Sequence, residues 1–219
     1  MDDLKFSEFI SLLKNQLEQP LPGEMAQFKM APVSRKTRDV ALKLQPNPKN
    51  SAILVLLYPQ NSKIKTVLME RNAYKGVHSK QISFPGGRVE SQDKNLMATA
   101  LREFEEEVGV PQQKITIIGE LTQLFIPPSG YLVNPFVGYV DFEPVFIPEE
   151  KEVADLIFPT IDELADTENL KTGTFLSGIS GIIVKAPYYR LHEKQVWGAT
   201  AMIISELNAI IENIKSLHQ

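Results

Sequence analysis

The chain has 219 residues, a formal net charge of −4, 43% hydrophobic residues and no cysteine. The length suits one well-buried domain with additions, or two small ones. The acidic balance argues against nucleic-acid binding, which needs a basic face, and the lack of cysteine excludes disulfides, thiolate metal sites and a cysteine nucleophile.

The N-terminal region predicts a helix followed by an irregular arm. Residues 4–18 place apolar side chains on one helical stripe. Residues 20–50 contain five prolines, which predict an irregular arm. The first residues, Met1-Asp2-Asp3, offer neither a basic n-region nor a long apolar stretch. We therefore expect no signal peptide, no membrane partner and a cytoplasmic location.

The middle of the chain predicts strands and one strong helix. Residues 52–58 and 65–69 have strand composition and are separated by a polar turn. A short strand at 81–84 leads into Pro85-Gly86-Gly87, a tight turn where backbone can approach a ligand closely. The helix that follows is expected to run from about Asn95 to Val108, because a C-cap glycine and a proline come next.

The remainder alternates short strands with two helices. Strands are expected near 115–124, 133–140, 153–158 and 181–184, with a short helix near 161–164 and a long amphipathic helix over 197–217. Mixed strands with a few helices predict an α/β (α+β) sandwich.

Charge is strongly segregated in the middle of the chain. Six basic residues and one acid lie between Lys63 and Arg88, whereas six acids and two basic residues lie between Glu90 and Glu107. This order suits a metal-bridged anionic substrate, with acids holding the cation and basic side chains meeting phosphate oxygens. Lys63 and Lys65 are expected to be ordinary surface residues. The candidate substrate-binding residues are Arg71, Lys75, Lys80 and Arg88.

A carboxylate cluster lies on the predicted helix. Glu103, Glu106 and Glu107 are spaced i, i+3 and i+4, so they share one helical face, where like charges repel. A solvated acidic face is the ordinary explanation of such a run. The adjoining glycine turn favours instead a divalent cation, because Mg²⁺ and Mn²⁺ prefer carboxylate, phosphate and water oxygens.

The stretch from Gly86 to Val110 resembles the Nudix box, the signature of the Nudix hydrolases. Its second half, Arg102 to Val110, matches the box at every defined position. The first half has one extra residue, because Arg88 stands where the glycine is usual and Gly87 comes one residue earlier. The coenzyme A diphosphatase branch of the family carries the same expansion.

Other segments also resemble the coenzyme A branch. They are Arg71 with Phe84-Pro85-Gly86-Gly87, Ser129-Gly130, Pro135-Phe136-Val137-Gly138, Glu152-Val153 before Phe158-Pro159, and Val196-Trp197-Gly198-Ala199-Thr200-Ala201. Asn72, Gly76 and Lys80 depart from the upstream pattern, which weakens the coenzyme A assignment more than the Nudix assignment.

The resemblance implies a Nudix fold, with a mixed β-sheet between helices and an added N-terminal helix. We therefore divide the chain into an N-terminal helix and arm, residues 1–50, and a Nudix domain, residues 51–219. The implied metal ligands for Mg²⁺ or Mn²⁺ are Glu103, Glu107, Glu106 and the Gly87 carbonyl. The implied catalytic residues are Glu106, Arg102 and Glu152, with Arg102 holding the loop through ion pairs. Glu149 and Glu150 are further candidates for the general base.

Three functions stay open at this point. The first is hydrolysis of coenzyme A or acyl-coenzyme A to 3′,5′-ADP and 4′-phosphopantetheine. The second is a Nudix diphosphatase for ADP-ribose, dinucleotides or nucleoside triphosphates. The third is a non-catalytic, nucleotide-sensing Nudix domain, which would not need all three glutamates. The expected partner is a small nucleotide-diphosphate substrate, and a homodimer is left open.

Overall fold

The computed structural model describes residues 5–33, 35–72, 81–177 and 182–217. Its helices are α1 (Phe6–Leu17), α2 (Gly23–Gln27), η1 (Phe28–Met30), α3 (Arg38–Leu44), α4 (Leu96–Val108), η2 (Gln112–Lys114), α5 (Ile161–Ala165), η3 (Thr167–Asn169) and α6 (Gly198–Leu217). Its strands are β1 (Lys49–Gln60), β2 (Lys63–Lys65), β3 (Leu68–Arg71), β4 (Ile82–Ser83), β5 (Gly86–Arg88), β6 (Thr116–Glu120), β7 (Leu124–Ile126), β8 (Tyr131–Tyr139), β9 (Val153–Ile157), β10 (Leu170–Ser177), β11 (Ile182–Leu191) and β12 (Lys194–Trp197).

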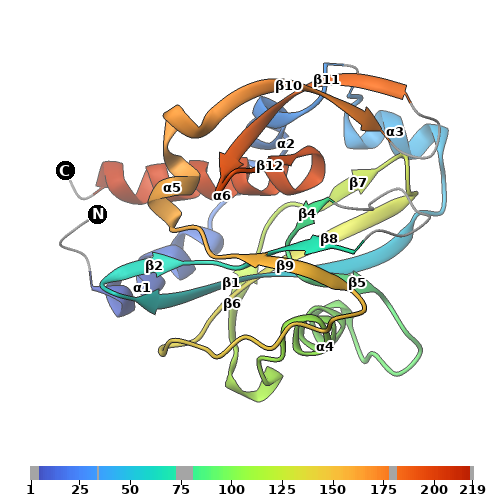
Figure 1. The fold of residues 1–219 in the computed structure, drawn as a ribbon. Helices are drawn as coiled ribbons and strands as arrows, with labels where there is room; N and C mark the ends of the chain where they lie inside the picture. Colours follow the sequence, from blue (N-terminus) through green and yellow to red (C-terminus); the bar gives the residue numbers. More distant parts are fainter. Residues whose placement is uncertain (1–4, 34, 73–80, 178–181, 218–219) are drawn as a thin grey trace.

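A mixed sheet forms the centre of the molecule, with α6 over one face and α4 over the other (Figure 1). Its main path is β2-β1-β8-β6, while β5 pairs with β1 and β7 pairs with β8. β1 and β8 run parallel, and the other described pairs of this sheet run antiparallel. Two further three-stranded sheets have the orders β10-β11-β12 and β4-β3-β9. The predicted mixed sheet between helices, with an added N-terminal helix α1, is therefore present.

The alternation of side chains along β1 feeds two hydrophobic cores. Val55 and Leu57 belong to the core under α6, whereas Leu54 and Leu56 belong to the core over α4. This follows from the period of two residues in a strand, which sends successive side chains to opposite faces. The strand reads as an almost continuous apolar run because both of its faces are covered.

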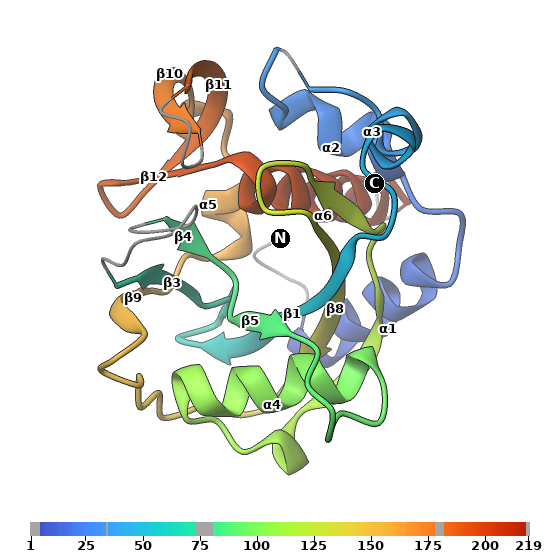
Figure 2. The ribbon, with the colours of Figure 1, turned by 90° about the vertical axis from the view of Figure 1, so that its right-hand side faces the viewer.

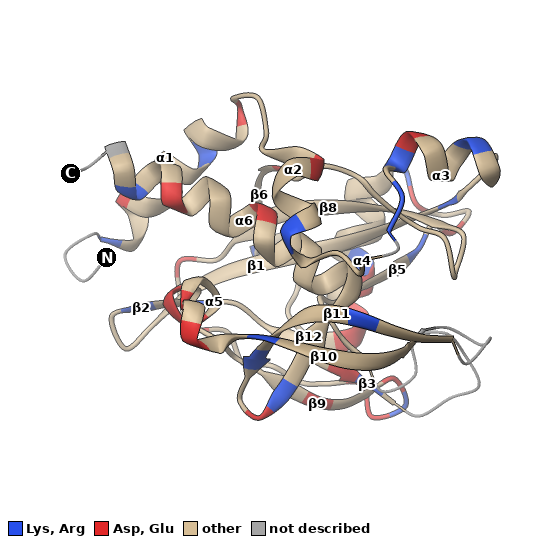
Figure 3. Ribbon diagram, turned by 90° about the horizontal axis from the view of Figure 1, so that it is seen from above, with Lys and Arg blue, Asp and Glu red and all other residues tan. Residues whose placement is uncertain are grey.

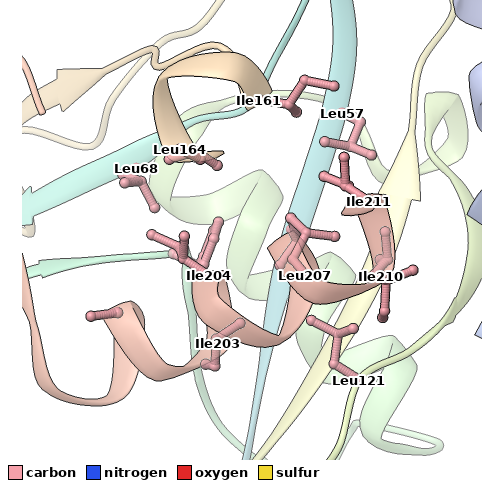
Figure 4. Packing of buried hydrophobic residues seen from close by; sticks show 14 of the residues in the cluster. Leu57, Leu68, Leu121, Ile161, Leu164, Ile203, Ile204, Leu207, Ile210 and Ile211 are labelled. Atoms are coloured by element: carbon pink, nitrogen blue, oxygen red, sulfur yellow. The ribbon is translucent and has the colours of Figure 1, made fainter. Parts of the chain in front are cut away.

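The packing of α6 fixes the upper layer. Ile204, Leu207 and Ile211 point from this helix toward Leu57 and Leu68 of the sheets (Figure 4). These side chains are at most 1% exposed. The predicted amphipathic C-terminal helix is thus confirmed.

Three predicted strands differ from the structure. The strand expected near 115–124 is divided into β6 and β7, which both pair with β8. The strand expected over 65–69 is divided, because β2 pairs with β1 whereas β3 pairs with β9 in another sheet. The single strand expected at 181–184 is part of the three-stranded β10-β11-β12 sheet. The turn between β11 and β12 uses His192 and Glu193 with φ of 46° and 64°. Such left-handed turns are usually marked by glycine or asparagine, and neither residue is present here to predict the turn.

The arm predicted to be irregular contains the short helices α2, η1 and α3. A buried carboxylate of α6, Glu206, accepts hydrogen bonds from the Gly23 backbone N–H, the Gln27 side-chain amide and the Thr122 backbone N–H. Tertiary contacts therefore hold helices that are too short to be stable alone. The boundary at residue 50 stays a prediction, and β1 begins at Lys49.

Within the described residues, no helix combines the length and hydrophobicity needed to cross a lipid bilayer.

Candidate active site

The helix α4 begins and ends as its sequence predicts. The Asn95 side chain accepts a hydrogen bond of 2.8 Å from the Ala98 backbone N–H at the N-terminus. At the C-terminus, Gly109 has φ of 76°, and its N–H donates to the Glu105 carbonyl at 2.9 Å. A Cβ at Gly109 would lie 2.8 Å from the Ile147 carbonyl oxygen, so glycine is required there for space as well as conformation.

Glu107 is held rigidly beneath the glycine turn. Its Oε2 accepts a 2.6 Å hydrogen bond from the Gly86 backbone N–H, and Arg71 Nη1 lies 3.1 Å from its Oε1. Arg71 Nη2 in turn donates to the Gly86 carbonyl at 2.7 Å. Gly86 has φ of 148°, and a Cβ there would lie 2.4 Å from the Ala52 carbonyl oxygen. The turn therefore needs glycine to bring its N–H onto Glu107.

The environment of Glu107 disfavours its charge. Burial raises the pKa of this carboxyl to about 7, and the neighbouring Glu103 and Glu152 add to the rise, against the opposing effects of Arg71 and the Gly86 N–H. The contact of Arg71 Nη1 with Oε1 is close enough for an ion pair, yet it lacks hydrogen-bond geometry, so the buried Oε1 has no hydrogen-bond donor among the described residues. An anionic oxygen that is buried without a donor fits a cation.

Glu103 lies against the second glycine of the turn. A Cβ on Gly87 would fall 2.4 Å from the Glu103 carboxyl carbon, so only glycine leaves room for that carboxylate in its present position. The side chain is 13% exposed and lies 3.1 Å from Arg102 Nη2. Burial raises the pKa of Glu103, with Arg102 opposing the rise.

Arg102 connects the loop to the helix, as predicted. Its Nε and Nη2 donate to the two Asp93 carboxylate oxygens at 2.8 and 2.9 Å, and Nη1 donates to Glu106 at 2.8 Å. Nη2 also donates to the Arg88 carbonyl at 3.2 Å. With side-chain exposures of 14% for Arg102 and 3% for Asp93, this is not a solvated surface pair. The bidentate contact holds the pKa of Asp93 well below its usual range.

The positions of Glu103 and Glu107 fit a divalent cation that also contacts the substrate of the protein. No group of three or more His, Cys, Asp or Glu side chains arranged to hold a metal occurs among the described residues. Two carboxylates, Glu103 and Glu107, meet at the cavity, and Mg²⁺ is typically held by one or two carboxylates with water and substrate phosphate. Glu106, with a 58% exposed side chain, is directed to Arg102 instead. The roles of Glu106 and of the Gly87 carbonyl as ligands stay predictions.

The carboxylates open into a cavity of about 470 Å³. Acidic side chains of α4 form one wall, and Ile126, Tyr131, Met202 and Ile203 contribute apolar surface elsewhere. The cavity is also lined by Glu152, Arg71 and Arg88.

Two candidate general bases line this cavity and two do not. Glu106 and Glu152 are among its lining residues, whereas Glu149 and Glu150 are not. The Glu149 carboxylate instead accepts from the Lys151 backbone N–H at 3.3 Å. Their positions at the cavity therefore favour Glu106 and Glu152 as candidates for the general base.

The structure locates part of the predicted basic group. Arg71 is engaged by Glu107 and Gly86, so its guanidinium positions the carboxylate, and its contact with substrate stays a prediction. Arg88 is exposed at the cavity. Lys75 and Lys80 lie outside the described residues.

Two residues line the cavity although the sequence did not predict a role for either side chain there. The Trp197 side chain is only partly buried. It stacks on Phe175 with ring centroids 4.4 Å apart and lines the cavity. Arg35, from the N-terminal arm, also lines it. No local motif marks Arg35, because its place in the cavity depends on tertiary packing.

Comparison with known proteins agrees with this geometry. The family model described as the NUDIX domain matches residues 48–176. A Yersinia enterocolitica protein described as an uncharacterized Nudix hydrolase, NudL, is 32% identical over 203 residues, which cover 92% of this chain and 90% of the relative. The NudL protein of Photorhabdus laumondii is 34% identical over 173 residues, covering 76% of this chain and 90% of the relative.

Solved structures share the fold. The Nudix hydrolase RenU from M. smegmatis has a TM-score of 0.51 at 16% identity, covering 76% of this chain and 88% of that chain. A MutT/nudix family protein from Enterococcus faecalis has a TM-score of 0.50 at 15% identity, covering 95% of this chain and 75% of that chain. Since the family model spans more than half of the sequence and a relative aligns over nine-tenths of it, the chain belongs to the Nudix hydrolases, enzymes that act on phosphorus-containing anhydrides.

Proposed function

We propose that this Nudix hydrolase cleaves the diphosphate of coenzyme A or acyl-coenzyme A, giving 3′,5′-ADP and 4′-phosphopantetheine or its acyl derivative. The observation that carries the proposal is the convergence of segments similar to the coenzyme A branch on one cavity. Phe84, Gly86 and Gly87 line it, and so do Ser129 and the stretch 197–200. These segments lie far apart in the sequence, so a shared ligand gives a common reason for their similarity.

The residues supply positioning more than covalent chemistry. A divalent cation held by Glu103 and Glu107 would neutralise charge on the diphosphate oxygens and polarise the attacking water. Arg71 and the Gly86 N–H fix Glu107, while Arg102 fixes the loop against α4. Such preorganised charges act where the transition state needs them, without rearrangement during the reaction.

We assign the general base to Glu152. No ion pair or side-chain hydrogen bond engages its carboxylate among the described residues, whereas Arg102 already holds Glu106. The water oxygen bonds to one phosphorus, the bridging P–O bond breaks, and a proton of the water passes to Glu152. Glu106 is the second candidate.

A substrate panel tests the substrate proposal. Hydrolysis is measured with Mg²⁺ and with Mn²⁺ on coenzyme A, an acyl-coenzyme A, ADP-ribose, a diadenosine polyphosphate and a nucleoside triphosphate, and the products are identified by chromatography. We expect the highest kcat/KM for coenzyme A or its acyl form, with release of 3′,5′-ADP. A higher kcat/KM for another substrate would indicate a Nudix diphosphatase that does not prefer coenzyme A. No hydrolysis of any substrate would favour a nucleotide sensor.

The base assignment is tested by comparing two variants. Glu152→Gln should lower kcat by about 10²–10⁴-fold, the usual contribution of general base catalysis. Glu106→Gln should lower kcat much less. The reverse pattern assigns the base to Glu106.

A further inference from the structure

Arg35 is a cation of the N-terminal arm that reaches the catalytic cavity. It lies in the coil between Pro32 and α3, and its backbone N–H donates to the Pro32 carbonyl at 2.9 Å. Its Nη2 donates to the Phe125 carbonyl of β7. Pro32 and Arg35 line the same cavity as Glu103 and Glu107. Residues from outside the matched family domain, 48–176, therefore complete the cavity.

The charge of Arg35 is poorly compensated within the protein. No described carboxylate lies within ion-pair distance of its guanidinium, and the Phe125 carbonyl is its one side-chain hydrogen-bond partner in the described part of the chain. Burial lowers the pKa of Arg35, and Glu24 opposes this only through a longer-range charge effect. The Glu24 carboxylate accepts instead from the Arg38 backbone N–H. A partly buried cation without a paired acid suits an anionic ligand.

The other described basic residues of the cavity have different positions. The Arg71 guanidinium is occupied by Glu107 and the Gly86 carbonyl, whereas Arg88 is exposed on β5 beside α4. Arg35 thus combines partial burial at the cavity with guanidinium N–H groups that have no partner among the residues that the structure describes. The guanidinium presents several donors in a plane, which matches the oxygens of a phosphate group.

The two charged parts of the cavity come from opposite sides of the molecule. In Figure 2, α4 lies at the bottom and the segment carrying α2 and α3 lies at the top. Figure 3 shows basic residues in blue just before α3, and this segment and β5 both contribute residues to the cavity lining. A ligand whose diphosphate contacts Glu103 and Glu107 would therefore present another group to Arg35.

We propose that Arg35 binds the 3′-phosphate of coenzyme A and so determines selectivity for substrates that carry a phosphate monoester apart from the cleaved diphosphate. This inference rests on the proposed function. Coenzyme A carries that third phosphate on its ribose, whereas 3′-dephospho-coenzyme A and ADP-ribose do not. Arg35 is on this reading a specificity residue, which acts on substrate binding and not on the bond that breaks.

The test compares coenzyme A with 3′-dephospho-coenzyme A in the full-length protein with Mg²⁺. Arg35→Met removes the charge and keeps an unbranched apolar stem. We expect the ratio of kcat/KM for the two substrates to fall about 10- to 100-fold, the range of a lost charged hydrogen bond, through KM for coenzyme A. Arg35→Lys should restore part of the ratio. Arg38→Met, a nearby arginine whose ion pair is with Asp39, is the matched control and should leave it unchanged.

A ratio unchanged in a folded Arg35→Met protein, or equal losses for both substrates, overturns the inference. Calorimetric binding of 3′,5′-ADP and of 5′-AMP to the wild type and to Arg35→Met gives an answer that does not depend on turnover. Preference for 3′,5′-ADP, reduced by Arg35→Met, supports the inference, and equal affinity overturns it. If the wild type hydrolyses neither form of coenzyme A, the proposed function fails, and the binding comparison still decides the role of Arg35.

Discussion

Replacing Glu107 by glutamine should separate catalysis from stability. Burial raises the pKa of this carboxyl from 4.5 to about 7. Because the folded-state pKa lies above the unfolded value, ionisation of Glu107 destabilises the metal-free protein progressively as the pH rises from 4.5, and fully once the pH exceeds about 7. The difference of about 2.5 pH units corresponds to at most about 3 kcal/mol. Glu107→Gln removes that cost, less any unfavourable contact of the amide with Arg71, so the metal-free protein should melt higher at pH 8, by up to roughly 6–12 °C.

The same substitution should abolish metal-dependent hydrolysis. Loss of one ligand charge should lower kcat by at least about 10²-fold, or roughly 2.7 kcal/mol. Steady-state kinetics with saturating Mg²⁺ and calorimetric melting with a chelator measure the two effects. Glu105→Gln is the control. Glu105 lies on the same helix, but its carboxylate accepts a hydrogen bond from the Gln112 side-chain amide, away from the cavity. A Glu107→Gln protein that keeps more than about a tenth of the wild-type kcat would refute the assignment of Glu107 as a metal ligand.

Three further outcomes follow from the same geometry. Mg²⁺ affinity should fall about tenfold per pH unit below about 7, because binding requires ionised Glu107; a flat titration of Kd from pH 5.5 to 7.5 would contradict this. Gly87→Ala should lower kcat strongly while the melting temperature changes little, since its Cβ would displace the Glu103 carboxylate, the far end of a flexible side chain. Asp93→Asn should destabilise the fold by about 3 kcal/mol at pH 7 by breaking the buried pair with Arg102. The pKa of Asp93 is depressed, so this stabilisation is fully present above the unfolded value of 3.8 and is lost progressively as the pH falls toward the lower folded-state pKa. The difference between the denaturant melts of Asp93→Asn and the wild type should therefore begin to shrink as the pH falls below about 4.

Local signals explain why α4 could be predicted closely. Asn95 and Gly109 act within a few residues of the helix ends they define, and the spacing of Glu103 and Glu107 fixes their shared face. The position of Arg102 between loop and helix could be predicted from the resemblance to the Nudix box. The burial of Glu107 Oε1, which has no hydrogen-bond donor within the described part of the chain, could not be predicted, because it depends on Arg71 and Gly86 reaching the helix from other strands.

Long-range packing explains what the sequence could not supply. The β10-β11-β12 sheet depends on pairing between residues with mixed patterns and on a turn without glycine. The helices of the arm are shorter than the length at which helices are stable alone, so only contacts made after folding define them. The role of Arg35 in the cavity was hidden for the same reason.

The helix α6 contacts both the catalytic cavity and the N-terminal arm. Its first residues, including Gly198 and Thr200, line the catalytic cavity, and the Thr200 hydroxyl donates to the Ile82 carbonyl at 2.9 Å. Farther along the helix, Glu206 binds the start of α2 through the Gly23 N–H at 3.1 Å, and the Ser205 hydroxyl donates to the Ala26 carbonyl at 2.7 Å. One rigid helix thus anchors both the cavity wall and the arm. Because the arm is fixed by buried polar contacts, Arg35 can be held in place without belonging to the matched domain.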